Sequence, residues 1–264
     1  MKVLVAYDGS LNSQKALKYG IDRVRENGGE LKVLHVFHAG MFIDYGAGPR
    51  AEEIARAESA RFVEEAKKII TEAAGNIKAE ITTVDGVPED EILGYAQSEK
   101  IDLLLSPPKY KALAKNAPCR VSIIPGNIIL AIDNTKSFLD LLEKVGHEAL
   151  GTGSRVILLG IVPVHLYSRT EKKELERIAK ETEEMVGKAK KELRNCGIEV
   201  KDVIRRGYPD EEILKVAGEN PVMMIVIPAS GDAPSELGKA ASIILDDEDS
   251  FRRPVMLAAS EKTA

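Results

Sequence analysis

The sequence repeats itself, and this repeat constrains the fold more than any other feature. Residues 86–93 read GVPEDEIL, and residues 207–214 read GYPDEEIL. A segment near the beginning of the chain is repeated too, because residues 5–10 (VAYDGS) resemble residues 130–135 (LAIDNT). Two matches in the same order along the chain indicate two copies of one folded unit.

The length of the chain and a proline–glycine pair near its middle both indicate two domains. A chain of 264 residues fits two domains of ordinary size, and 44% hydrophobic residues suffice for two packed cores. Pro125 and Gly126 lie between the copies, where such a pair is typical of a turn. We therefore expect one domain at residues 1–125 and a second at residues 126–264.

Each copy alternates short apolar segments with longer amphipathic ones. We expect strands in the first copy near residues 2–7, 31–37, 79–84, 102–106 and 120–124. We expect strands in the second copy near residues 127–132, 155–162, 199–205, 222–227 and 254–258. Alternating strands and helices are typical of a parallel sheet covered by helices on both faces. The predicted fold class is therefore α/β, with two tandem, doubly wound, five-stranded parallel sheets.

Prolines and glycines mark the ends of several expected helices. Pro88 and Pro209 suit the first turn of a helix, where a missing amide proton costs nothing. Acidic residues follow both prolines and favour the positive helix start. A charged segment, residues 171–195, is predicted as one long helix that ends before Gly197.

Composition excludes several classes of protein. Lys and Arg number 37 against 42 Asp and Glu, a net charge of -5, whereas a nucleic-acid-binding protein favours a basic surface. The apolar run at residues 121–132 is too short to span a membrane. Strand-like residues 3–7 leave no room for a signal peptide, and two cysteines are too few for a disulfide framework. We expect a cytoplasmic protein with no nucleic-acid or membrane partner.

Five landmarks follow one another in a fixed order along the chain. They are VAYDGS at residues 5–10, LHV at 34–36, GVP at 86–88, IDLLL at 101–105 and APC at 117–119. Together they resemble a universal stress protein domain, here in tandem over nearly the whole chain. The resemblance implies a Rossmann-like fold of five parallel strands and four helices, the architecture shared with the adenine-nucleotide α-hydrolases. It also implies an intramolecular pseudo-dimer through the last strands, with a homodimer of chains as a further expectation.

The resemblance also implies an adenine-nucleotide site in the second copy. Nucleotide-binding members of the family combine a strand-one Asp, a residue at the end of strand two and a loop of pattern G-x2-G-x9-G-[ST]. Glycines in such a loop let phosphate approach the backbone amides. The matching positions are Asp133 for the ribose, Ile161 for the adenine, and Gly231 and Ser242 in the phosphate loop.

The phosphate loop of the second copy departs from the family pattern. Pro228 replaces the first glycine and has no amide proton, and Ala241 replaces the third. Asp232 and Glu236 add negative charge where a nucleotide brings more. These departures count against a nucleotide. In the alternative in which the second copy still binds one, the ligand is AMP or ATP, the latter with Mg²⁺, and AMP tolerates a damaged triphosphate cradle better.

The first copy departs further from the family pattern. Asp8 and Val36 match the ribose and adenine positions. Residues 86–121 form a shorter stretch than their counterpart in the second copy, and the phosphate loop is the part that is missing. Lys109 could attract an anion, although a solvated helix face is the favoured interpretation.

Three functional hypotheses follow. The preferred one is a non-catalytic stress-response protein that acts by binding a protein partner or a small ligand, because no catalytic set is recognisable. The second is an AMP or ATP sensor that uses the second copy. The third, a nucleotide hydrolase, is disfavoured because neither strand-one turn has the Ser-Gly-Gly-x-Asp-Ser-like loop of those enzymes.

Two further features remain open at this level. The connection at residues 38–50 is unusually apolar and is interpreted as a lid, a partner contact or a buried segment. The four histidines lack zinc-type spacing, and His35 is expected to pack against the sheet.

Overall fold

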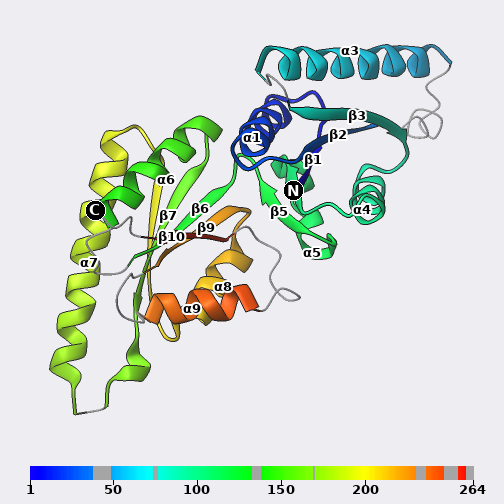
Figure 1. Cartoon of the computed structure of the whole chain (residues 1–264). Helices are drawn as coiled ribbons and strands as arrows, with labels where there is room; N and C mark the ends of the chain where they lie inside the picture. The colour runs from blue at the N-terminus through cyan, green and yellow to red at the C-terminus, as the bar shows by residue number, and fades with distance from the viewer. Residues whose placement is uncertain are drawn as a thin grey trace. The chain divides into compact units, whose positions relative to one another are not determined.

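The computed structural model describes residues 1–37, 49–73, 77–132, 138–168, 170–229, 236–246 and 255–259. The chain divides into two compact units, Met1–Pro125 and Gly126–Ala264 (Figure 1). Each unit contains one five-stranded sheet, and every pair of neighbouring strands is parallel. The expected α/β fold class is confirmed.

The strand order in the first unit is β3-β2-β1-β4-β5. Its strands are β1 (Lys2–Ala6), β2 (Glu30–Phe37), β3 (Lys78–Asp85), β4 (Leu103–Ser106) and β5 (Arg120–Ile123). The chain leaves β1 toward one edge of the sheet and later returns to its other side. In sheets of this kind ligands bind at the carboxyl ends of the strands where the order reverses, here β1 and β4.

Helices cover both faces of the first sheet. They are α1 (Leu11–Asn27), α3 (Pro49–Ala73), α4 (Pro88–Ser98) and the four-residue α5 (Leu113–Asn116), with a 3₁₀ turn at Pro108–Tyr110. Alternate residues of β1 face opposite sides, so Leu4 packs with α4 and α5 while Val5 lies under α1. A Cβ on Gly20 would lie 3.1 Å from Val5, which shows how closely α1 approaches the sheet.

The second unit repeats this topology. Its strands are β6 (Asn127–Ile132), β7 (Arg155–Val162), β8 (Val200–Arg206), β9 (Val222–Ala229) and β10 (Val255–Ala259). Their order is β10-β9-β6-β7-β8, so β6 holds the central position that β1 holds in the first unit. The sequence repeat is therefore a repeat of the fold.

The helices of the second unit include the long charged helix and the helix starting at Pro209 that the sequence predicts. They are α6 (Phe138–Thr152), α7 (Lys172–Asn195), α8 (Pro209–Glu219) and α9 (Glu236–Asp246), with a 3₁₀ turn at Val164–Leu166. Both α4 and α8 start at their prolines, and Gly197 follows α7 with a φ of 80°. Across the described ranges, no helix combines the length and the apolar character that a bilayer crossing demands.

Candidate functional site

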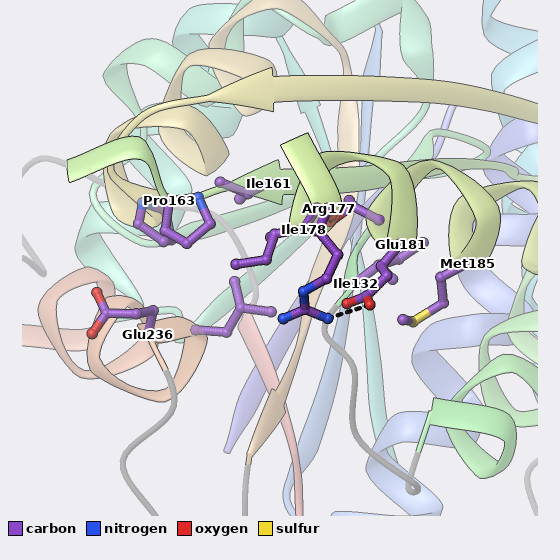
Figure 2. Close-up of a pocket in the computed structure, with 11 residues that line it drawn as sticks. Ile132, Ile161, Pro163, Arg177, Ile178, Glu181, Met185 and Glu236 are labelled. Atoms are coloured by element: carbon purple, nitrogen blue, oxygen red, sulfur yellow. Dashed lines mark hydrogen bonds and ion pairs between the residues drawn. The ribbon is translucent and has the colours of Figure 1, made fainter. Parts of the chain in front are cut away.

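A cavity of about 310 Å³ opens at the carboxyl ends of β6 and β7 (Figure 2). It is lined by Ile132, Ile161, Pro163, Arg177, Ile178, Glu181, Thr182, Met185, Pro209, Glu236 and Leu237. These residues come from two strand ends, one face of α7 and the first residues of α8 and α9. The position is the one where parallel α/β sheets bind ligands, and the volume is near the lower limit of roughly 300 Å³ for small-molecule sites.

The close approach of α7 to β7 creates one wall of the cavity. Gly160 has no side chain, and a Cβ there would lie 2.7 Å from Thr182 and 2.9 Å from Val186. The next residue along the strand, Ile161, points to the opposite face and joins the core beneath α8 and α9. The cavity forms where these two faces meet at the strand end, with Ile132 and Ile161 almost fully buried.

An ion-pair network lies on the α7 wall. The Nε and Nη2 atoms of Arg177 donate to the carboxylate of Glu174 at 3.0 and 2.6 Å, and Nη1 donates to Glu181 (Figure 2 shows the Arg177–Glu181 pair). The hydrogen bonds that Arg177 donates to Glu174, together with the charge of Glu174, raise the pKa of Arg177 above its ordinary value, and Glu181 adds to the effect. All three guanidinium nitrogens are thus engaged by carboxylates one turn away on the same helix.

A histidine joins the loops on the other side of the cavity. His165, in the 3₁₀ turn after β7, donates from Nε2 to Glu236 at 3.1 Å. Its ring also stacks on Tyr208, with ring centroids 4.2 Å apart and an interplanar angle of 21°. Since Tyr208 precedes α8 and Glu236 begins α9, the imidazole connects three segments around the cavity.

Glu236 is held at the start of α9 by two partners. Lys239 donates to one carboxylate oxygen at 2.7 Å, and His165 contacts the other. The hydrogen bond from Lys239, followed by that from His165, holds the pKa of Glu236 below its usual value. This carboxylate is therefore ionised at neutral pH, next to the positive end of its own helix.

The first unit arranges the equivalent position differently. Asp8 follows β1 and accepts hydrogen bonds from the backbone amide and hydroxyl of Ser10, at 3.0 and 2.5 Å. Lys109, from the 3₁₀ turn after β4, places its Nζ 3.3 Å from the same carboxylate. Burial opposes ionisation of Asp8, but Ser10, Ser13 and Lys109 outweigh it and hold its pKa below the usual value. The interpretation of Lys109 as part of a solvated helix face was incomplete, because its ammonium group pairs with Asp8.

Aromatic packing also fills space around this first-unit turn. Gly9 has a φ of 75°, and a Cβ there would lie 2.2 Å from Phe62 of α3, so this position requires glycine. The ring of His35 meets Phe62 edge-on at 5.7 Å, and its Nδ1 donates to the Tyr7 carbonyl at 2.9 Å. The prediction that His35 packs against the sheet is confirmed.

Comparison with known proteins identifies the family. The model of the universal stress protein family matches residues 1–106 and 126–244, one match in each unit. The chain belongs to the universal stress protein family. The two matches cover most of the chain, so the tandem arrangement expected from the sequence repeat is confirmed.

Individual universal stress proteins resemble parts or all of the chain. Universal stress protein MJ0531 of Methanocaldococcus jannaschii is 27% identical over 107 residues, which are 39% of this chain and 62% of that protein. A universal stress protein structure from Archaeoglobus fulgidus aligns with 100% of this chain and 97% of its own at 19% identity and a TM-score of 0.43. An Arabidopsis thaliana family structure with AMP bound aligns with 47% of this chain and 90% of its own, at 20% identity and a TM-score of 0.33.

The structure describes four of the six predicted site residues of this universal stress protein. Ile161 lines the cavity, whereas Ser242 is exposed on α9 and donates to the Gly238 carbonyl at 3.3 Å. Asp8 pairs with Lys109, and Val36 is partly buried beside the core under α4 and α5. Asp133, Gly231 and residues 38–48 of the apolar connection lie outside the described residues.

Sequence reasoning missed the side chains of α7 and the histidine that joins the loops. Arg177 and Glu181 belong to a charged helix that reads as an ordinary solvated surface. His165 contacts Glu236, which lies 71 residues away in the sequence, so no local pattern connects them. The sequence feature that could have identified His165 is its position three residues after a buried strand, where ligand sites of parallel sheets lie.

Proposed function

We propose that this universal stress protein is a non-catalytic, cytoplasmic stress-response protein that binds a small adenine-containing ligand in its second domain. The observation that carries the proposal is the cavity at the carboxyl ends of β6 and β7, which Ile161 lines. The family resemblance assigns the adenine to that position. An apolar cavity of this volume suits a flat ring system better than it suits an extended peptide.

The contacts of the charged side chains support binding without catalysis. Arg177, Glu181 and Glu236 line the cavity, and each is engaged in an ion pair with a neighbour on its own helix. Groups held in this way stiffen the walls and orient the helices. A general acid or base instead needs a perturbed pKa near neutrality, and the pKa of Glu236 moves in the opposite direction.

A thermal-shift titration tests the proposal. The full chain is titrated with adenosine, AMP, ADP and ATP, with and without Mg²⁺, because a ligand that binds only the folded state raises the melting temperature. We expect a saturable shift that Ile178→Trp removes by filling the cavity from α7. Ile69→Trp, on the corresponding helix α3 of the first domain, is the matched control and should leave the shift intact.

Two outcomes would contradict the proposal. One is the absence of a shift at millimolar concentrations of adenosine and of every nucleotide, and the other is a shift that survives Ile178→Trp. Steady hydrolysis of ATP by the purified protein would contradict the non-catalytic part of the proposal. Binding of a protein partner remains a separate prediction.

A further inference from the structure

The charges that face the cavity of the second domain are unfavourable for a phosphate group. Among the described residues that line it, two carboxylates, Glu181 and Glu236, accompany one cation, Arg177. Arg177 already directs its Nε and Nη2 atoms to Glu174 and its Nη1 atom to Glu181. Three of the five N–H groups of Arg177 are thus already donated to carboxylates, and a phosphate that bound the remaining two would lie beside those negative charges.

The start of α9 is also occupied by a negative charge of the protein itself. Helix starts attract anions through their exposed amide groups and the helix dipole. Glu236 is the first residue of α9, and Lys239 and His165 hold its carboxylate in place. Lys239 is therefore neutralised before any ligand arrives, and a phosphate near this helix start would meet a like charge.

The backbone at the end of β9 offers fewer amide donors for a phosphate than the family's loop pattern does. β9 ends at Pro228 and Ala229, and Pro228 has no amide proton to donate. By contrast, several of the lining side chains are apolar. Ile132, Ile161 and Ile178, all labelled in Figure 2, line the cavity, where a ring system would contact them.

We propose that the cavity prefers an uncharged nucleoside to the corresponding nucleotide, so that adenosine binds more tightly than AMP and AMP more tightly than ATP. This inference rests on the proposed function, because it names the charge state of the ligand at the same site. Its basis is the contrast between the apolar strand ends and the carboxylates that already engage Arg177, Lys239 and the start of α9.

Isothermal titration calorimetry of the full chain with adenosine, AMP and ATP tests the preference. We expect adenosine to bind at least about tenfold more tightly than AMP at low salt. Added salt should narrow this ratio, because it screens repulsion of the phosphate and leaves the neutral ligand unaffected. Tighter binding of AMP than of adenosine would overturn the inference and leave the proposed function intact, whereas no binding of any ligand would overturn both.

Substitution of the carboxylates tests the cause of the preference. Glu236→Gln keeps the shape of the side chain, removes its charge and releases Lys239, so the adenosine-to-AMP ratio should fall by about tenfold. Glu219→Gln removes a charge that pairs with Arg205 at the far end of α8 and should leave the ratio unchanged. An unchanged ratio in Glu236→Gln would contradict the assigned cause.

A second pair of variants keeps the test decisive if Glu236→Gln does not fold. Glu181→Gln frees Nη1 of Arg177 on the opposite wall and should also improve AMP binding relative to adenosine. Glu184→Gln removes a charge from the same helix that pairs with Lys180 and does not line the cavity. Equal ratios in these two variants would overturn the inference.

Discussion

The two domains share a strand order but differ at the carboxyl ends of their central strands. In the second domain a cavity of about 310 Å³ opens beside β6, and its walls are helices α7, α8 and α9. In the first domain the aspartate that follows β1 is engaged by Ser10 and Lys109. The same sheet topology thus presents a ligand-sized space in one copy and an internally paired carboxylate in the other.

The length of one connection accounts for much of this difference. Between β9 and β10 the second domain includes α9, a helix of 11 residues, whereas β4 and β5 are joined by a 3₁₀ turn and the four-residue α5. The short connection brings Lys109 next to Asp8. Two copies of one fold therefore carry different side chains and a different connection at the same strand ends.

The largest expected effect comes from Gly160→Ala, which targets the second domain alone. Its new methyl group would overlap Thr182 and Val186 and force α7 away from β7. We expect a loss of about 1–3 kcal/mol in the free energy of unfolding, the usual cost of overpacking, together with loss of ligand binding. Urea denaturation and the ligand-induced thermal shift measure the two effects.

Gly187→Ala is the matched control on the same helix. Nothing lies within 4 Å of the position that its Cβ would occupy, so alanine should stabilise the helix by about 0.5–1 kcal/mol. If Gly160→Ala were as stable as the parent protein, close packing of α7 would not be what shapes the cavity wall.

An intermediate effect is expected for His165→Phe. Phenylalanine keeps the ring that stacks on Tyr208 but loses the hydrogen bond to Glu236, which is worth about 0.5–1.5 kcal/mol. The pKa of Glu236 should rise toward its ordinary value without returning fully, because Lys239 remains. Chemical denaturation and carboxyl NMR titration report these changes, and an unchanged pKa would show that His165 does not contact Glu236 in solution.

The smallest effect is expected for Lys109→Met in the first domain. Lys109 is 61% exposed, so its ion pair with Asp8 should contribute at most about 1 kcal/mol at neutral pH. The folded-state pKa of Asp8 is depressed, so this contribution is present above the unfolded-state pKa and disappears as pH falls through the folded-state value.

The pH dependence of unfolding provides the test of this pair. The parent protein and Lys109→Met should differ in stability at pH 7 and converge at pH values where Asp8 is protonated. A difference that stays constant down to acidic pH would assign the effect of Lys109 to its packing on Tyr110. The second domain serves as the internal reference, because Lys109→Met should not change the rise in melting temperature that its ligand causes.

Much of the fold follows from local sequence patterns. The repeat predicts two similar domains, and alternating apolar segments predict strands within a few residues of those observed. Pro88 and Pro209 mark helix starts because their chemistry acts within one turn. Ile161, which the family resemblance predicts as the adenine contact, lines the cavity at the end of β7.

The remaining parts of the site depend on contacts between distant residues. Lys109 and Asp8 are 101 positions apart, and their pairing is set by how a shortened connection crosses the sheet. The approach of α7 depends on the absence of a side chain at Gly160, a packing effect that sequence periodicity does not carry. A pattern of residue types predicts helices and strands. The distances at which those helices and strands pack depend on the volumes of the side chains between them.

The pairing of Asp8 with Lys109 also bears on how freely the connection after β4 can change in length. A longer connection inserted after β4 would carry Lys109 away and leave Asp8, whose side chain is only 14% exposed, without its counter-ion. Because Lys109 is 61% exposed and Ser10 would still donate to Asp8, loss of this ion pair alone should cost at most about 1 kcal/mol. The connection after β4 can therefore change in length without unfolding the first domain.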